Sequence, residues 1–572
     1  MAGSLSRSRR YVLLLLLLCG FGVVLFRLVT LQVLQAAELS AQANRQHQKT
    51  VSLEGARGTI VDRHGKILAM NVEVQSVFGV PNTVDSPLKT ARQLSPILHV
   101  RTDELERKLR QDRRFVWLAR KLDPEQGRRL DRLSLDGIGV VMEGRRFYPK
   151  GPLLAHVLGF SGMDGEGLEG VEHRYEPYLH GEKRMMVLQR DAHGHTVFPK
   201  GMTERSPTPG HSLTLTIDEV IQYVVERELE DAVGQAQAKS GTMIVLDPKT
   251  GAVLAMAVSP RFDPNAVSAL SRDRWRNRAL TDTYEPGSTM KAMMAAAAIE
   301  ERVVRPNTMM FGENGHMTVA NTVIHDHERL GWISFAQVIQ KSSNIGAVKT
   351  GMALGEQRLY RYLQAFGFGQ RTEIDLPGEG AGLVSNPRDW GRRSIASISI
   401  GQEIGVTPLQ MVSAVAALAN GGVLMKPYVV SEIRDAEGQI LRQIPPQARR
   451  RIVSPETARS VTKILEGVVT DGTGAKAAIP GFRVAGKTGT AQQIDRDTKT
   501  YSTSRFVASF AGYVPSDIPR LAMIVIIDEP QDKKASGGSV AAPVFSRVGE
   551  QVLSYLGVPS DAPITLAMAS RQ

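Results

Sequence analysis

One stretch organises this sequence: Tyr284-Glu285-Pro286-Gly287-Ser288-Thr289-Met290-Lys291-Ala292-Met293-Met294. Its Pro-Gly pair interrupts the backbone, and the small apolar residues that follow, up to Ile299, predict a helix. Ser288 therefore lies at or near a helix start, where serine is a favoured cap and free backbone N–H groups point outward. Lys291 follows three residues later on the same helical face. The stretch predicts a nucleophile beside a base, although a Ser-x-x-Lys on a helix is more often a cap and a surface lysine.

Two motifs further along the chain complete a constellation with this stretch. The segment Gln340-Lys341-Ser342-Ser343-Asn344-Ile345-Gly346 supplies Ser342 and Asn344, two residues apart at a predicted tight turn. Lys487-Thr488-Gly489-Thr490-Ala491 is predicted to be a strand whose exposed edge pairs with an extended peptide substrate. Gly489 is expected to let the substrate backbone approach closely. Enzymes whose active-site serine is acylated by penicillin carry Ser-x-x-Lys, a Ser-x-Asn type triad and Lys-Thr-Gly in this order.

Order and context exclude the spare copies of these motifs. Lys249-Thr250-Gly251 lies in a predicted hairpin turn and precedes Ser288. Lys349-Thr350-Gly351 falls in a predicted helix shortly after Asn344, and Ser86-Pro87-Leu88-Lys89 has no companion motifs. The copies at Ser288 and at Lys487 are therefore the functional ones.

Charge and cysteine content narrow the class of protein. The net charge of +12 and the pI near 9.7 fit nucleic acid, anionic lipid or an acidic polymer as partner. Because basic runs interleaved with aromatic residues and zinc-finger patterns are both missing from the sequence, nucleic acid is disfavoured. Cys19 is the only cysteine, which excludes an intramolecular disulfide. The segment His325-Asp326-His327-Glu328 matches no zinc spacing and indicates a solvated loop.

The N-terminus predicts a membrane anchor. Arg7, Arg9 and Arg10 precede an apolar run from Tyr11 that continues past Arg27, and a membrane helix needs about 20 such residues. Residues 1–10 are predicted to be a cytoplasmic tail and residues 11–32 the span, with the rest of the chain outside the cytoplasm. The alternative is a cleavable signal peptide, whose site Ala41-Gln42-Ala43 lies well past the run.

The remaining chain divides at the linker Ser206-Pro207-Thr208-Pro209-Gly210. Residues 33–205 are predicted to form a first domain, with a hairpin around Gly65 and surface helices over residues 85–135. Residues 206–212 form the linker, residues 213–560 a second domain and residues 561–572 a tail.

The second domain is predicted to be α+β. Strands are expected at 213–217, in a hairpin over 242–256, and at 506–513 and 521–527. Helical patterns dominate between Ser288 and Asn420. Strands at both ends with helices between them predict an antiparallel sheet joined to a helical cluster.

The chain resembles the class B penicillin-binding proteins, which are monofunctional peptidoglycan transpeptidases, and most of all their division-specific FtsI type, also called penicillin-binding protein 3. The residues from Glu285 to Lys291 and from Lys487 to Ala491 match that family closely, and the Arg57-Gly58-Thr59-Ile60-Val61-Asp62-Arg63 segment resembles the start of its non-catalytic pedestal domain. Two later segments resemble further pedestal motifs: Arg145-Arg146-Phe147-Tyr148-Pro149 and Glu169-Gly170-Val171-Glu172. The middle residue of the triad is Ser343 rather than Asp, and a Ser-x-Asn triad with a variable middle residue resembles the synthase members of the family.

The resemblance implies a two-step acyl transfer. Ser288 would attack the penultimate D-alanyl carbonyl of a stem peptide with Lys291 as base. The N–H groups of Ser288 and Thr490 would hold the oxyanion, and Ser342 would pass a proton to the leaving D-alanine. An amine from a neighbouring strand would then attack the acyl-enzyme. Lys291 acts as a base only if burial and the nearby Lys487 lower its pKa.

The remaining roles also follow from the resemblance. Asn344 and Lys487 would hold the catalytic amines and the acyl chain. Thr488, Gly489 and Thr490 would bind substrate, with the two threonines on its terminal carboxylate. No metal or cofactor is implied.

The implied partners are peptidoglycan stem peptides on lipid II-derived strands, β-lactam antibiotics, the inner membrane, an FtsW-like glycosyltransferase of the SEDS type and other division proteins. The implied location is the periplasmic side of the septal membrane. An elongation-type transpeptidase, a membrane-anchored β-lactam sensor and a non-enzymatic division scaffold stay open as alternatives.

Overall fold

The computed structural model describes residues 7–39, 48–113, 115–133, 135–190, 196–197, 207–267, 270–495, 498, 500–532 and 534–560. The predicted C-terminal tail 561–572, the first six residues of the cytoplasmic tail and the Ala41–Ala43 site lie outside the described residues, as does Ser206 of the linker. The chain divides into two compact units. The first comprises Met1–Ala56 with Gly181–Pro209, and the second Arg57–His180 with Gly210–Gln572.

The first unit contains the apolar helix and a strand ribbon. Helix α1 (Arg7–Val29) continues into a π-helical turn, Thr30–Leu34. Within the described part of the chain, Arg9–Leu34 is the one helix long and apolar enough to cross a membrane, with a mean hydropathy of 2.8. Strand β1 (Gln48–Glu54) pairs antiparallel with β6 (Lys183–Arg190), which also pairs with β7 (Thr196–Val197).

The second unit opens with the predicted hairpin. Strands β2 (Ile60–Val61) and β3 (Ile67–Gly79) pair antiparallel, and Gly65 in the turn has the positive φ of 81° that glycine permits. Strand β3 also pairs with β4 (Val116–Ala119) and β5 (Ile138–Phe147).

Three helices cover this part of the sheet: α3 (Pro87–Leu98), α4 (Thr102–Leu109) and α5 (Pro124–Leu130). They bury Leu94 and Leu105 against β3 and β4. The helices predicted over 85–135 are present, and β4 is the exception within that range. Its four residues are too few to show a strand period against the surrounding helical pattern.

One sheet crosses the predicted linker. Strand β8 (Ser212–Leu215) pairs parallel with β2 and antiparallel with β16 (Val430–Arg434), which also pairs with β17 (Ile440–Gln443). The strand order is therefore β17-β16-β8-β2-β3-β4. Within the linker the His211 N–H donates to the Tyr178 carbonyl at 2.8 Å. The linker is therefore hydrogen-bonded to its surroundings along part of its length. The placement of a domain boundary at residues 206–212 stays a prediction.

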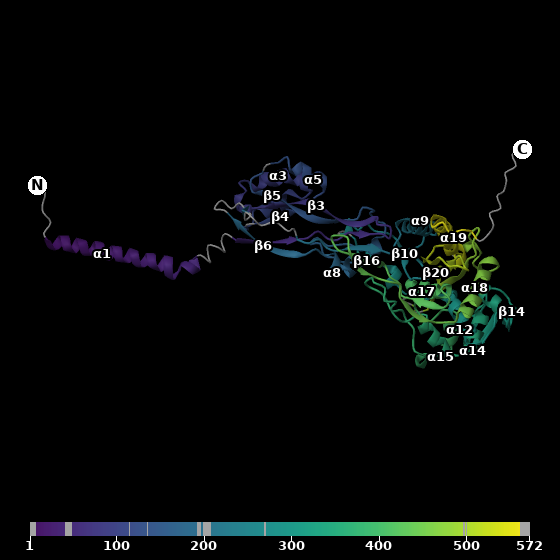
Figure 1. The fold of residues 1–572 in the computed structure, drawn as a ribbon. Helices are drawn as coiled ribbons and strands as arrows, with labels where there is room; N and C mark the ends of the chain where they lie inside the picture. The colour runs from purple at the N-terminus through teal and green to yellow at the C-terminus, as the bar shows by residue number, and fades with distance from the viewer. Residues whose placement is uncertain are drawn as a thin grey trace. The chain divides into compact units, whose positions relative to one another are not determined.

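The predicted antiparallel sheet has five strands in the order β10-β9-β21-β20-β19, of which β10 and β20 are labelled in Figure 1. They are β9 (Ser240–Leu246), β10 (Val253–Ser259), β19 (Ala485–Ile494), β20 (Tyr501–Val514) and β21 (Leu521–Asp528). Every residue of β9 is buried, because both sheet faces are covered. Met243 and Val245 face one hydrophobic cluster while Ile244 and Leu246 face another, following the two-residue period of a strand.

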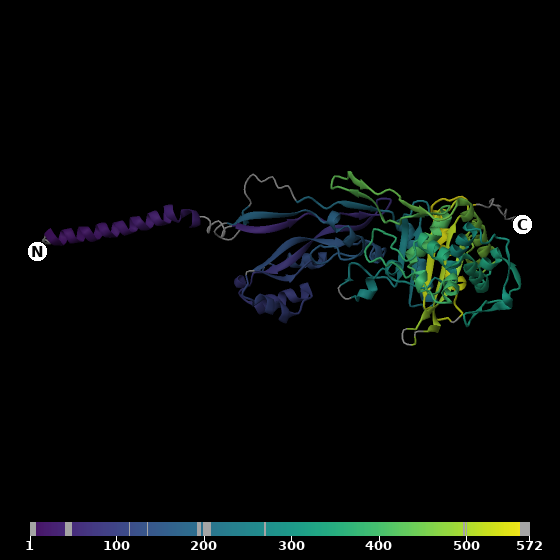
Figure 2. The same cartoon turned by 90° about the horizontal axis from the view of Figure 1, so that it is seen from below.

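Helices pack on both faces of this sheet. One face carries α9 (Glu219–Gln235) and α19 (Ala542–Tyr555), which contact each other. The other carries α17 (Pro408–Ala419) and the helical cluster, shown in green and teal beside the yellow strands in Figure 2. The cluster contains α12 (Lys291–Glu300), α13 (Phe335–Gln340), α14 (Asn344–Leu354), α15 (Glu356–Ala365) and α18 (Pro455–Thr470). The α+β prediction is confirmed.

The remaining elements are short. The helices are α6 (Ala155–Leu158), α7 (Gly170–Arg174), α8 (Glu176–Leu179), α10 (Arg272–Trp275), α11 (Arg278–Thr281) and α16 (Ser394–Ser399). The strands are β11 (Met309–Phe311), β12 (His316–Val319), β13 (Thr322–His325), β14 (Trp332–Ser334), β15 (Val423–Met425), β17 (Ile440–Gln443) and β18 (Ala448–Arg451).

Candidate active site

Ser288 lies in a tight turn that leads into a buried helix. The turn is the 3₁₀ segment Gly287–Met290, and α12 follows it directly. Gly287 has a φ of 54°, and its N–H donates to the Gly401 carbonyl at 3.0 Å. A Cβ at Gly401 would lie 2.1 Å from the Gly287 carbonyl oxygen, so Gly401 requires glycine, while the positive φ of Gly287 favours glycine there. The paired glycines hold the backbone on either side of the nucleophile.

The Ser288 side chain does not cap the helix. The turn has no side-chain capping bond, and among the described residues the Ser288 hydroxyl makes no hydrogen bond at all. The cap interpretation is therefore wrong, because the backbone around Gly287 rather than a serine side chain sets the helix start. The hydroxyl stays free for chemistry.

Lys291 is fully buried beneath this turn. Its Nζ donates to the Ser342 carbonyl and to Asn344 Oδ1, both at 2.7 Å, and lies 3.3 Å from Ser342 Oγ. Burial lowers the pKa of Lys291 to about 7, although the negative charge of Asp326 opposes the shift. A neutral amine at physiological pH is what a general base requires.

Ser342 occupies a left-handed backbone position between two helices. Its φ is 59°, and it connects the end of α13 to the start of α14. This conformation is uncommon for a residue with a Cβ and is stabilised here by its surroundings. Ser343 caps α14, because its Oγ accepts the Gly346 N–H at 3.0 Å. The serine that replaces Asp in the triad therefore has a definite structural role.

Asp326 holds this connection in place and was missed by the sequence analysis. Its carboxylate accepts the Ser343 hydroxyl at 2.6 Å and the backbone N–H groups of Asn344 and Ile345. The carbonyl of the preceding His325 accepts from Asn344 Nδ2 at 2.8 Å. The segment assigned to a solvated loop therefore positions the middle motif. The only signal in the sequence was an acidic residue with no predicted partner.

Lys487 brings the third motif to the same point. Its Nζ lies 3.0 Å from Ser342 Oγ and 3.2 Å from the Thr488 carbonyl. Burial and then the charge of Lys291 lower the pKa of Lys487 well below its usual value. Both lysine amines lie within hydrogen-bonding distance of the Ser342 hydroxyl, and the repulsion between them lowers the pKa of Lys487. Burial lowers the pKa of Lys291 as expected, whereas Lys487 is not among the causes of that shift.

The third motif lies on an edge strand, as predicted. Strand β19 pairs with β20 and lies at the end of the sheet order. The Thr488 hydroxyl is 2.6 Å from that of Thr473, and the Thr490 hydroxyl accepts the Gly537 N–H at 3.2 Å. Sequence reasoning missed Thr473 and Gly537, which carry no motif of their own.

Gly489 lies against the protein's own nucleophile turn. A Cβ there would lie 2.5 Å from Ser509 Oγ, 2.9 Å from Thr289 Cγ2 and 3.0 Å from the Pro286 carbonyl oxygen. The space is filled by the protein's own nucleophile turn. Gly489 therefore lets β19 pack against that turn, and the expectation that it lets a substrate backbone approach closely stays a prediction.

The rejected motif copies lie elsewhere in the fold. Asp247, Lys249 and Gly251 form the β9–β10 turn, in which the Lys249 N–H donates to the Asp247 carboxylate at 2.9 Å. Lys349 lies in α14 and donates to the Phe311 carbonyl at 2.7 Å. Neither lysine joins the cluster of Lys291, Ser342, Asn344 and Lys487. The predicted oxyanion donors, the Ser288 and Thr490 N–H groups, stay a prediction.

The arrangement can perform acyl transfer. A free hydroxyl lies one turn from a lysine of lowered pKa, a second hydroxyl lies between two amines, and a strand edge adjoins them. These are the parts of a nucleophile, its base and a proton relay.

Two family models cover most of the chain. Residues 241–550 match the penicillin binding protein transpeptidase domain, and residues 52–215 match the penicillin-binding protein dimerisation domain. Stage V sporulation protein D of Bacillus subtilis is 35% identical over 556 residues, which cover 95% of this chain and 86% of the relative. Peptidoglycan D,D-transpeptidase FtsI of Escherichia coli is 33% identical over 566 residues, covering 96% and 93% of the two chains.

Solved structures agree. The crystal structure of penicillin binding protein 3 from Mycobacterium tuberculosis, complexed with aztreonam, superposes with a TM-score of 0.71 at 28% identity. It covers 90% of this chain and 99% of the other.

Proposed function

The chain belongs to the class B penicillin-binding proteins of the FtsI type and is a serine-type peptidoglycan D,D-transpeptidase; from this premise we propose that Ser288 is its nucleophile and that it acts in septal wall synthesis. The observation that carries the first proposal is the cluster around Ser342 Oγ, where two buried lysines lie at 3.3 and 3.0 Å beneath the Ser288 turn.

The first half-reaction forms the acyl-enzyme. Neutral Lys291 takes the Ser288 hydroxyl proton as Oγ attacks the penultimate D-alanyl carbonyl of a stem peptide. The N–H groups of Ser288 and Thr490 bind the oxyanion. The C–N bond then breaks, and Ser342 passes a proton to the leaving D-alanine nitrogen and regains one through the adjoining lysines.

The second half-reaction forms the cross-link. An amine of a neighbouring stem peptide attacks the ester carbonyl, loses its proton through the same relay, and releases Ser288 Oγ. Asn344 holds Lys291 through its Oδ1, while the hydroxyls of Thr488 and Thr490 face the terminal carboxylate of the donor. β-Lactams acylate the same serine, since their strained amide resembles the D-Ala-D-Ala bond.

Labelling with a fluorescent penicillin tests the nucleophile. Wild type and Ser86→Ala, which removes the serine of the rejected motif copy, should both be labelled, and Ser288→Ala should not. Labelling that survives in Ser288→Ala would disprove the assignment. Complementation of a deletion strain by the Ser288→Ala variant would instead support a non-enzymatic scaffold.

The anchor and its orientation follow the same premise. The apolar helix fits a single-pass membrane protein whose catalytic part is periplasmic. We place the N-terminus in the cytoplasm because Arg9 and Arg10 precede the span. An alkaline phosphatase fused after residue 560 should be active, and a fusion before residue 7 inactive.

The division role rests on the relatives named FtsI. A fluorescent fusion should gather at mid-cell, and recruitment there should depend on an FtsW-like glycosyltransferase. Fluorescence along the side wall would favour the elongation-type alternative.

A further inference from the structure

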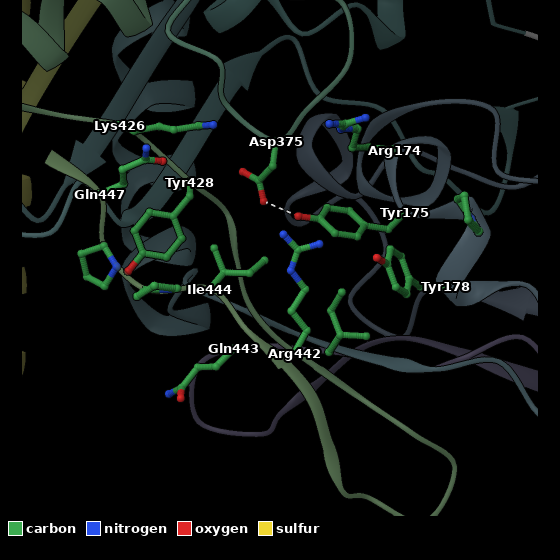
Figure 3. Close-up of a pocket in the computed structure, with 14 residues that line it drawn as sticks. Arg174, Tyr175, Tyr178, Asp375, Lys426, Tyr428, Arg442, Gln443, Ile444 and Gln447 are labelled. Carbon is green, nitrogen blue, oxygen red and sulfur yellow. Dashed lines mark hydrogen bonds between the residues drawn. The ribbon is translucent and has the colours of Figure 1, made fainter. Parts of the chain in front are cut away.

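A cavity of about 600 Å³ lies in the second unit and contains none of the catalytic residues (Figure 3). Elements far apart in sequence form its walls. Tyr175 and Tyr178 come from the α7–α8 region, Asp375 from the loop after α15, and Arg442 from β17. Its volume is that of a small-molecule or short-peptide site.

The single carboxylate in the lining is already satisfied. Asp375 accepts the backbone N–H groups of Val429 and Val430 at 2.7 and 2.9 Å and the Tyr175 hydroxyl at 2.7 Å. Its oxygens are therefore turned toward these three donors and not toward the cations of the cavity.

The cations, by contrast, are largely unpaired. Among the described residues, neither Arg174 nor Arg442 has an ion pair, and the nearest carboxylate to Lys426 is that of the exposed Glu373 at 3.6 Å. Figure 3 shows the Arg442 guanidinium extending into the middle of the cavity toward Tyr175. Three positive charges against one negative charge give the lining a net positive charge. Arginine forks bind carboxylates well.

Apart from Gln443 and Gln447, the rest of the lining consists of tyrosine, proline and isoleucine side chains. Tyr178 and Tyr428 present ring surfaces, and Pro445 and Pro446 also line the cavity. Such surfaces bind an extended peptide backbone, while the cations bind its acidic groups.

We propose that this cavity is a second binding site for the wall polymer, which takes the carboxylates of an uncross-linked stem peptide. The proposal rests on the proposed function, since stem peptides are the polymer on which the enzyme acts and carry several carboxylates along a short chain. The cavity is too small for a folded partner, and its three spaced cations match several carboxylates of one peptide. A bound peptide would connect Arg174, in the N-terminal half of the chain, with Lys426 and Arg442 of the transpeptidase part.

Binding is measured on the full-length protein in detergent, acylated by a penicillin to close the catalytic cleft. The probe is the stem tripeptide L-Ala-γ-D-Glu-meso-diaminopimelate, which lacks D-Ala-D-Ala. Its binding is measured by isothermal titration calorimetry. We expect saturable binding by wild type, a loss of at least tenfold in affinity in Arg442→Gln, and a further loss in the double variant Arg174→Gln, Arg442→Gln. Arg388→Gln, which changes an exposed arginine outside the cavity, should bind as wild type does.

The outcomes separate the alternatives. Equal binding of the fully amidated tripeptide, or of inorganic phosphate at the same concentration, would overturn the proposal, as would unchanged affinity in the double variant. Tighter binding of a linear L-glutamate peptide with no binding of the stem tripeptide would indicate an acidic segment of a partner protein instead. Acylation reports separately on the proposed function and on folding, since every variant should react with penicillin at the wild-type rate.

Discussion

At the scale of single residues, the site depends on keeping two lysine amines out of water and close together. Lys291 and Lys487 are almost completely buried, at 0% and 1% exposure, and both approach Ser342 Oγ. Burial disfavours the charged form of each amine, and a second nearby amine adds to that cost. Because the two titrations are coupled, the protons leave in steps that belong to the pair.

The pH dependence of acylation follows from this. Lys291 must be neutral to accept the Ser288 proton, and its pKa is lowered to about 7. We expect the rate constant for acylation by penicillin to fall about tenfold per pH unit below pH 7 and to level off above it. Stopped-flow acylation across pH 5–9 measures this. A rate that stays flat down to pH 5 would contradict Lys291 as the base.

Asp326 is predicted to act as a positioning residue. Asp326→Asn replaces the carboxylate that accepts the Ser343 hydroxyl and the Asn344 N–H with a neutral amide, which weakens both hydrogen bonds. We expect the acylation rate to fall, since a shift of about 1 Å in catalytic groups costs about 100-fold in rate. Because the Asp326 charge raises the pKa of Lys291, its removal should also move the acid limb of the pH profile to lower pH. Glu328→Gln, which only touches exposed Lys341, serves as control. A rate loss with an unmoved acid limb would argue for a purely structural role.

At the scale of elements, the catalytic groups depend on three backbone junctions. The turn at Ser288 is held by Gly287 against Gly401, the α13–α14 connection by Asp326, and strand β19 by its packing on the nucleophile turn. Each junction brings main chains closer than side chains would allow or uses a backbone conformation that needs support. Secondary structure alone does not determine the distances between the three motifs.

Gly489→Ala tests the packing of β19. The added methyl would overlap Ser509 Oγ and the Pro286 carbonyl oxygen, so the strand must move away from Ser288. We expect acylation to fall about 100-fold and stability to fall by about 1–3 kcal/mol from overpacking. Gly234→Ala in α9 meets no atom within 4 Å and should leave acylation unchanged while raising helix stability by up to about 1 kcal/mol. Normal acylation by Gly489→Ala would rule out the tight packing.

At the scale of the whole molecule, a buried ion network supports the pedestal side of the second unit. Glu172 is completely buried and accepts Arg57 and Arg146 at 2.6 Å each. Arg146 also donates to the Gly58 carbonyl at 2.7 Å. The network thus connects residues that flank β2 with the end of β5 and with α7.

Glu172→Ala should be strongly destabilising. The change leaves the buried Arg146 guanidinium without its carboxylate and removes one of the two carboxylates paired with Arg57, and breaking a buried pair in this way costs about 3–5 kcal/mol. Thermal unfolding of the detergent-solubilised protein measures the loss. Glu176→Ala removes a partner of Arg57 that is 29% exposed and should cost only about 1 kcal/mol or less. Below the unfolding temperature Glu172→Ala should still react with penicillin at the wild-type rate. Equal stability of the two variants would contradict the prediction.

The α+β class, the apolar helix and the hairpins could be predicted from the sequence, because hydrophobic period and turn residues are local signals. The order of the three motifs along the chain selected Ser288, Lys291, Ser342, Asn344 and Lys487 as the predicted site residues. Tertiary structure alone decided how those residues meet. Asp326 lies 18 residues before Asn344 in the chain, and its function depends on a fold that returns it to the α14 N-terminus. The packing of Gly489 against the nucleophile turn depends on a fold that brings β19 to Ser288, which lies about 200 residues earlier in the chain. Burial, which lowers the pKa of Lys291, is a property of the packed core and has no local signal in the sequence.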